Sequence, residues 1–312
     1  MTSTYRYQLA GLAFQAPVPL PELGTEQSDA SEADVQIVES AVPAPPQGPA
    51  PLGGMAWSST SDCCLLDIHG VARFAVSGGR DISFERTGGA SDHLLRLYLL
   101  GSVLGALWHQ RGVLPLHAGA VAIDGRAWAF VGQSGAGKSS LVVTMAACGA
   151  GYLCDDVCVV QMTTDKGAYV WPGLARLRVS PEICELLALA GEPPVDPMGK
   201  YTLAPRWPRP HGTRPLAGVV VLETDHDAAQ PALDRLDSAS ALSALLTHTY
   251  RPEYLSMEQR ARHFGYCAAV ARQVPVYRLR RSWGTARLRG DALHVSKLLA
   301  GLAATDRPAR AR

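Results

Sequence analysis

The sequence lacks three features that define large classes of proteins. It has no uninterrupted apolar run of the ~20 residues that a membrane-spanning helix needs, and the best candidate, residues 97–108, is too short. Lys and Arg number 29 against 28 Asp and Glu, so the net charge of +1 offers no basic surface for nucleic acid. The N-terminus lacks the charged segment and apolar core of a signal peptide. We therefore expect a cytoplasmic protein without membrane or nucleic-acid partners.

Cysteines are few and form no recognisable framework. There are seven, and an odd number at scattered spacings argues against a set of disulfide bonds. Cys154 and Cys158 have no second pair of ligands nearby, so zinc is not indicated. We expect small buried residues in a reducing compartment.

What the chain does contain is enough apolar sequence for a packed core. Of its 312 residues, 47% are hydrophobic and 18% are charged, which is typical of one large or two smaller globular domains. Short runs of β-branched and aromatic residues predict a β-rich region over residues 1–90, with a Pro/Gly-rich loop at 41–54. Helical and strand patterns alternate over residues 91–304, which predicts an α/β domain, and residues 305–312 should form a flexible tail.

The stretch FVGQSGAGKSSLVV predicts a site for phosphate groups. A short apolar strand enters a glycine-rich loop, and a helix is expected over residues 138–147. Gly132, Gly137, Lys138 and Ser139 match the pattern Gly-x-x-x-x-Gly-Lys-Ser in the strand–loop–helix context that it requires. Backbone N–H groups and the helix N-terminus would face the phosphates of ATP, Lys138 would reach the β- and γ-phosphates, and Ser139 would bind Mg²⁺. The residues expected to hold the nucleotide here are Gly132, Ser134, Gly135, Ala136, Gly137, Lys138, Ser139 and Ser140.

Two adjacent carboxylates follow the loop at short range. Asp155 and Asp156 come 17 residues after Lys138, directly after a short strand that we expect beside the strand entering the loop. If the two strands are parallel, the Asp pair lies near the phosphates. One carboxylate could then hold Mg²⁺ and the other accept the proton of an attacking hydroxyl. A solvated turn is the alternative, but a carboxylate pair in an apolar strand is costly unless a cation neutralises it.

Three further side chains are candidates for the same site. We expect His117 on the strand that forms a hairpin with the loop strand, at the edge of the phosphate site. There it could orient the base or contact the γ-phosphate; a core position is an equally good interpretation. A transferring phosphoryl group needs positive charge beyond Lys138. Lys200, in a long Pro-rich loop, is our candidate for a lid residue, with a solvated surface charge as the alternative. Arg176 follows a short strand and could also contact the phosphates.

Missing motifs narrow the class of phosphate-binding protein. The chain has no Asn-Lys-x-Asp run for guanine, and no signature helix with a glutamate after the metal aspartate, as a transport ATPase would have. These absences favour a kinase.

The runs LHA before the loop, GQSGAGKS as the loop and LCDDV after it resemble, in order and spacing, the HPr kinase/phosphorylase family. The Asp pair is also similar to that of phosphoenolpyruvate carboxykinases, which share the fold. The resemblance implies an α/β kinase core with a mixed sheet and flanking helices. It also implies that Asp155 is the general base, that Asp156 and Ser139 assist magnesium, and that His117 is a catalytic residue of the active site. The loop motif leads us to expect Lys138 to be catalytic as well.

The chain departs from the bifunctional members of that family. Ser140 stands where they have a glutamate, and their Glu-x-Arg-Gly-x-Gly signature is absent. These departures argue against phosphorylase activity, HPr as substrate and a hexamer, and they leave homo-oligomer formation open. The runs YRYQLAGLAFQAPVPLPEL, DPMGKYTLAP and VPVYRLR are similar to shorter HPr-kinase-like proteins of gene clusters for ribosomally made peptides, including lasso peptides.

The resemblance therefore implies an ATP-dependent kinase that phosphorylates a serine hydroxyl of a precursor peptide or protein. Two alternatives stay open. One is a nucleotide-sensing module that binds ATP and gates a partner without transfer, and the other is a kinase for a sugar or polyol.

Overall fold

The computed structural model describes residues 4–24, 32–49, 51, 54–165, 167–189, 199–207, 209–282 and 284–305. Contacts between Cα atoms divide the chain into two compact units. The first unit combines Met1–Pro115 with Thr249–Tyr266, and the second combines Leu116–His248 with Cys267–Arg312. The chain therefore contributes two separate segments to each unit. The predicted tail, 305–312, lies outside the described residues except for its first position.

In its described residues, the first unit contains a seven-stranded sheet in the order β1-β2-β3-β7-β6-β5-β4. Its strands are β1 (Tyr5–Leu9), β2 (Leu12–Ala16), β3 (Val35–Glu39), β4 (Met55–Ser59), β5 (Cys63–Ile68), β6 (Ala72–Ser77) and β7 (Asp81–Arg86). Buried and half-buried residues alternate along β6, as expected for a strand with one face on a core. These strands lie where the sequence is β-rich.

A long helical segment also belongs to the first unit. Ser91 caps α1 (Asp92–Tyr98) by accepting a hydrogen bond from the N–H of Leu94, and the helix continues through a π-helical turn, Leu99–Val103, into α2 (Leu104–Gln110). The apolar face of α2 packs against β6. The unit boundary thus falls after this helix rather than at residue 90, because the sheet covers the apolar side of the helix.

The later segment 249–266 joins the first unit through long-range hydrogen bonds. The hydroxyl of Ser59 donates to the carbonyl of Tyr254 at 2.6 Å, and the side-chain amide of Gln259 donates to the carbonyl of Ser61 at 3.0 Å. The expected continuous domain over 91–304 is therefore interrupted by this segment.

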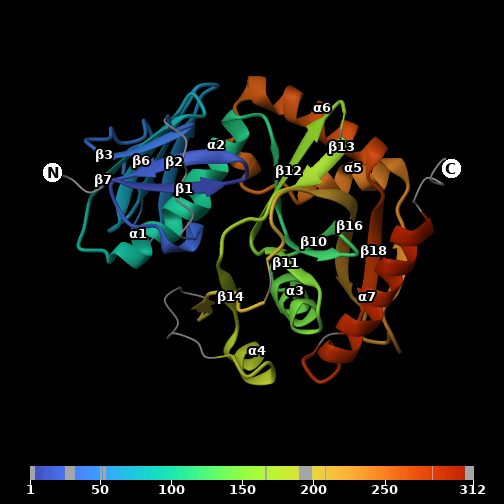
Figure 1. Cartoon of the computed structure of the whole chain (residues 1–312). Helices are drawn as coiled ribbons and strands as arrows, with labels where there is room; N and C mark the ends of the chain where they lie inside the picture. The colour runs from blue at the N-terminus through green and yellow to red at the C-terminus, as the bar shows by residue number, and fades with distance from the viewer. Residues whose placement is uncertain are drawn as a thin grey trace. The chain divides into compact units, whose positions relative to one another are not determined.

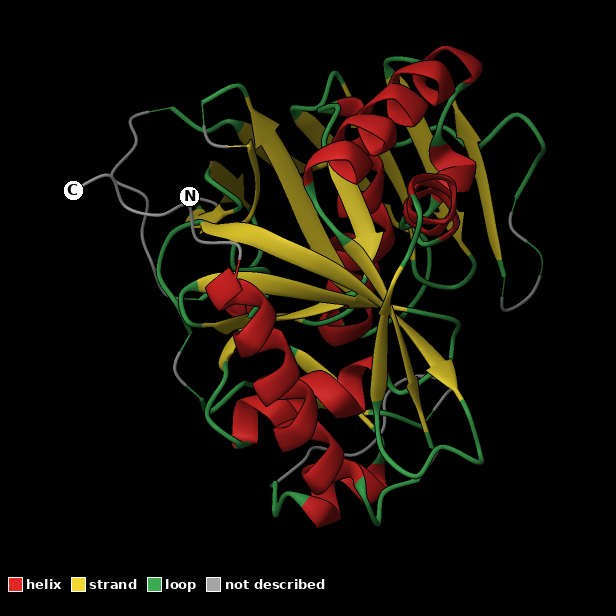
Figure 2. Cartoon of the chain, turned by 90° about the vertical axis from the view of Figure 1, so that its right-hand side faces the viewer, coloured by secondary structure: helices red, strands yellow, loops and turns green. Residues whose placement is uncertain are grey.

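The described part of the second unit is a nine-stranded mixed sheet with flanking helices (Figures 1 and 2). The sheet order is β11-β9-β10-β16-β13-β12-β8, with β18 also paired to β16 and β17 to β18. The strands are β8 (Leu114–His117), β9 (Gly119–Ile123), β10 (Arg126–Val131), β11 (Gly151–Cys154), β12 (Val157–Thr163), β13 (Gly167–Val170), β16 (Arg214–Thr224), β17 (Ala232–Arg235) and β18 (Val276–Arg281). The other elements of this unit are α3 (Lys138–Ala147), α4 (Pro181–Leu186), α5 (Ser238–Thr247), α7 (Leu288–Thr305) and the two-stranded pair β14 (Leu177–Val179) and β15 (Tyr201–Leu203). Helix α6 (Met257–Gln273) begins in the first unit and ends in the second.

Helices α3 and α7 pack against each other and against this sheet. Leu141 and Met145 of α3 and Val295 of α7 share a fully buried cluster with Phe130 of β10. The helix that follows the phosphate loop is thus fixed by apolar packing along its length, which holds the loop at its N-terminus in place.

Strand order differs from the expectation in one respect that matters for the site. The hairpin at Asp124-Gly125 is confirmed, with β9 antiparallel to β10. However, β11 pairs with β9 and not with β10, so the prediction that it lies beside the loop strand is wrong. Because β9 is antiparallel to both, β11 still runs in the direction of β10, and the two strands end at the same edge of the sheet. A hairpin signal is local and does not show which strand pairs with its outer edge.

Candidate phosphate-binding and acidic site

The phosphate loop connects buried β10 to α3, which begins at the predicted residue, Lys138. Gly135 and Gly137 have φ angles of 83° and 84°, a left-handed conformation that residues with a Cβ rarely adopt. At Gly132, an added Cβ would lie 3.1 Å from the carbonyl oxygen of Leu222. The glycines are therefore required by the path of the backbone.

Lys138 is buried at the start of α3. Its Nζ donates to the carbonyl oxygens of Gly132 at 2.9 Å and Gln133 at 3.1 Å. Burial lowers the pKa of this ammonium group, nearby Lys200 lowers it further, and the Asp pair opposes the shift. The loop thus holds a partly desolvated cation at its centre, where an anionic ligand would neutralise it.

Asp155 is buried and connects the loop helix to a neighbouring strand. Its Oδ1 accepts a hydrogen bond from the hydroxyl of Ser139 at 2.8 Å, and its Oδ2 accepts one from the backbone N–H of Arg178 at 3.1 Å. Burial raises the pKa of this carboxyl, and the charge of Asp156 raises it further. The serine and the carboxylate that could share a metal ion are therefore already in contact.

Asp156 has different neighbours. Its backbone is left-handed, with φ of 73°. Its Oδ1 lies 3.4 Å from Nδ1 of His117, and its Oδ2 lies 3.6 Å from Nη1 of Arg178. The Asp156 carbonyl oxygen also lies 3.1 Å from His117 Nδ1. Burial lowers the pKa of His117 below its ordinary value, and Lys138 adds to this effect against the opposing charge of Asp156.

A second histidine, which the sequence did not indicate, lies beside the first. The carbonyl oxygen of His248, at the C-terminal end of α5, accepts a hydrogen bond from the N–H of His117 at 2.8 Å. Burial, with Lys138 and His117, lowers the pKa of His248 to about 4. The imidazole of His248 is therefore neutral near pH 7.

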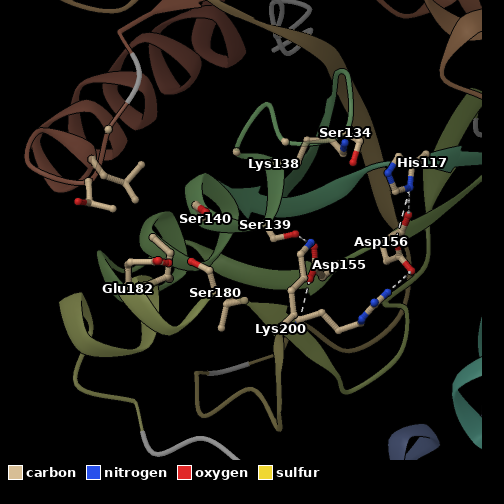
Figure 3. A pocket seen from close by; sticks show the side chains of 18 of the residues that line it. His117, Ser134, Lys138, Ser139, Ser140, Asp155, Asp156, Ser180, Glu182 and Lys200 are labelled. Carbon is tan, nitrogen blue, oxygen red and sulfur yellow. Dashed lines mark hydrogen bonds and ion pairs between the residues drawn. The ribbon is translucent and has the colours of Figure 1, made fainter. Parts of the chain in front are cut away.

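Most of the predicted site residues line one pocket of about 530 Å³ in the second unit (Figure 3). The predicted residues that line it are His117, Ser134, Gly135, Gly137, Lys138, Ser139, Ser140, Asp155, Asp156 and Lys200. In Figure 3, His117 and Asp156 lie at one end, Ser139 and Asp155 lie in the middle, and Ser140 and Glu182 lie toward the other end. The expectation that His117 lies on the hairpin strand is wrong, because that strand, β9, begins at Gly119 and His117 is the last residue of the preceding strand, β8.

Three predicted residues do not line the pocket. Gly132 offers its carbonyl oxygen to Lys138, and Ala136 packs against the hydrophobic core. Arg176 is buried and does not line the pocket. Arg178, two residues later, lines it in the place of Arg176.

Several lining residues were not predicted, among them Arg178, Ser180, Glu182 and Arg281. Alternation along β14 could have identified Arg178 and the following Ser180, because Leu177 and Val179 are buried in the core. Side chains on either side of a buried residue in a strand point to the opposite face. Arg281 has no comparable local signal.

Comparisons with known proteins yield little. No protein-family model matches the chain, and no curated protein matches it. One similar solved structure is the Hpr(Ser) kinase/phosphatase from Coxiella burnetii, with 11% identity and a TM-score of 0.32 over 61% of this chain and 97% of that one. A likeness this weak does not place the chain in a family.

The residues that the structure describes contain no group of three or more His, Cys, Asp or Glu side chains arranged to hold a metal ion. Within the same residues, no helix combines the length and the apolar character needed to cross a membrane.

Proposed function

We propose that the pocket binds Mg-ATP and that the protein transfers the γ-phosphoryl group to a hydroxyl group. The observation that carries this proposal is the contact between Ser139 and Asp155, 2.8 Å apart beside buried Lys138. A glycine-rich turn with only a structural role has no need of a lysine, a serine and a carboxylate around one cavity. The volume of about 530 Å³ lies within the usual range for small-molecule sites.

The residues present fit a magnesium ion. Mg²⁺ takes one or two carboxylates together with substrate phosphates and water, so it needs no cluster of three protein ligands. Ser139 and Asp155 would hold it, and it would offset the charge on the β- and γ-phosphate oxygens. Lys138 would exchange its two loop carbonyls for phosphate oxygens.

The contacts favour an exchange of the roles expected for the two aspartates. Asp155 is in contact with the loop serine, which suits a metal ligand. Asp156 lies between His117 and Arg178 at the end of the pocket, which suits the base that orients and deprotonates the acceptor hydroxyl. We therefore infer that Asp156 is the base, that His117 positions it, and that Asp155 assists the metal.

For the acceptor, we propose a serine hydroxyl of a peptide, such as the precursor of a ribosomally made lasso peptide. The loop and the Asp pair resemble the HPr kinase/phosphorylase family, and the runs at residues 5–23, 196–205 and 274–280 resemble HPr-kinase-like proteins of such gene clusters. These two resemblances support the proposal. A sugar or polyol is the second candidate, and transfer to it is an alternative outcome of the test below.

The test is phosphate transfer measured by mass spectrometry. The protein would be incubated with Mg-ATP and either a serine-ending precursor peptide encoded beside its gene or a panel of sugars and polyols. We expect one added phosphoryl group on the peptide serine, and none with Lys138→Met. ATP binding without transfer to any acceptor would instead indicate a nucleotide-sensing module.

A further inference from the structure

A buried arginine from outside the phosphate loop lines the same pocket. Arg281 is the last residue of β18, and only 4% of its surface is exposed. Its Nη2 donates to the carbonyl oxygen of Ala136, inside the loop, at 3.4 Å, and its Nη1 donates to that of Ser282 at 3.5 Å. Both hydrogen bonds are long and weak. Nε has no acceptor among the residues that the structure describes.

The guanidinium group of Arg281 is therefore buried with too few hydrogen-bond acceptors. A guanidinium group has five N–H donors and stays charged at neutral pH. Burial lowers the pKa of Arg281, and the carboxylate of Asp291 on α7 opposes the shift through space. Buried donors and buried charges are costly unless they are paired. An anion in the pocket would satisfy the group that these long contacts leave unsatisfied.

The sheet places Arg281 and Asp155 on opposite sides of the loop. The relevant strand order is β11-β9-β10-β16-β18, with the loop after the central strand β10. Asp155 directly follows β11, two strands to one side. Arg281 ends β18, two strands to the other side, and pairs with Thr224 of β16. Because β10, β16 and β18 are parallel, their C-terminal ends meet at the edge where the loop begins.

We propose that Arg281 binds a phosphate group of the nucleotide that stays with the leaving group, either the α- or the β-phosphate. This inference rests on the proposed function. The transferred phosphate must face Asp156 and His117 at one end of the pocket, so a cation across the loop from Asp155 meets the phosphates that are not transferred. Arginine suits this task, since its planar fork can donate two hydrogen bonds to one phosphate. The bidentate contact would replace the long contacts to Ala136 and Ser282.

The test is calorimetric titration of the full-length protein with ADP. We expect Arg281→Met to raise the Kd for ADP roughly 10- to 100-fold, the effect of losing hydrogen bonds to a charged group. Arg281→Lys keeps the charge but loses the fork and should show a smaller rise. The matched control is Arg280→Met on the same strand, because Arg280 is exposed and pairs with Asp234 at 2.8 Å; its Kd should match wild type.

Thermal melting of each variant separates binding from folding. Arg281→Met removes a buried cation and, with it, the charge that interacts with the buried carboxylate of Asp291, so this variant should melt below wild type. If Arg281→Met does not fold, the Kd for ADP is measured with Arg281→Lys, which keeps the charge. An unchanged Kd in a folded Arg281 variant would overturn the inference. Failure of the proposed function looks different: wild type would not bind ADP, or Lys138→Met would bind it equally well.

Discussion

At the scale of single residues, the two adjacent aspartates have different environments, and the same substitution should therefore affect them differently. Asp156→Asn removes the base beside His117 and should lower the transfer rate about 10²- to 10⁴-fold while largely sparing Mg-ATP binding. Asp155→Asn removes the carboxylate that contacts Ser139 and should weaken Mg²⁺-dependent ATP binding roughly 10- to 100-fold. Single-turnover rates and calorimetric titrations with and without Mg²⁺ measure both effects.

The two variants are controls for each other, because each keeps the size of the side chain and removes one charge. If Asp155→Asn abolished transfer without weakening Mg-ATP binding, the assignment made from the sequence, with Asp155 as the base, would stand instead.

At the scale of secondary-structure elements, two glycines allow the shape of the phosphate loop to be separated from the stability of helix α3. Gly135 in the loop and Gly149 after the end of α3 both have positive φ, and a Cβ added at either would meet no atom within 4 Å. Alanine should therefore cost each position a similar ~1 kcal/mol of stability. Only at Gly135 would the methyl group enter the pocket. We expect Gly135→Ala to abolish or strongly weaken ADP binding and Gly149→Ala to leave it unchanged.

Urea unfolding and ADP titration of both variants check this prediction. Equal losses of ADP affinity would mean that the loop acts through stability alone and not through its shape.

The C-terminal end of α5 should make folding sensitive to acid. His248 has an ordinary pKa of 6.5 in the unfolded chain and a pKa of about 4 in the folded protein. Between these values the unfolded chain binds a proton that the folded protein does not, so stability is full above pH 6.5 and falls as the pH drops toward 4. After allowance for partial exposure, the loss is on the order of 1–2 kcal/mol.

Urea unfolding at pH 7.5, 6 and 5 tests this effect, with His248→Gln as the comparison. The variant should lose less stability than wild type over this range. Parallel losses in the two proteins would show that other groups cause the acid sensitivity.

For the whole molecule, the parts that could be predicted are those encoded by neighbouring residues. The strand, glycine loop and helix at residues 138–147 follow from local geometry, and so does the position of the Asp pair after a strand. The insertion of β9 between β10 and β11 depends on pairing between distant segments, and no local pattern encodes it. The choice of Arg178 over Arg176 needs the register of β14, and Arg281 lies more than a hundred residues beyond the loop that it contacts.

The division into units depends on distant contacts in the same way, and it predicts the behaviour of a fragment. Residues 91–312, the predicted catalytic domain with its tail, begin with α1 and α2 but lack the strands of the first unit. The fragment would expose the apolar face of α2, which packs against β6, and would leave Tyr254 and Gln259 without their partners Ser59 and Ser61. Exposed apolar patches of this kind promote aggregation.

We expect the fragment to be insoluble or to melt without a cooperative transition, whereas full-length protein melts cooperatively. Circular dichroism and size-exclusion chromatography of the two proteins decide the matter. A soluble fragment that melts cooperatively and binds ADP with the affinity of the full chain would show that the domain boundary lies at residue 90, as the sequence suggested.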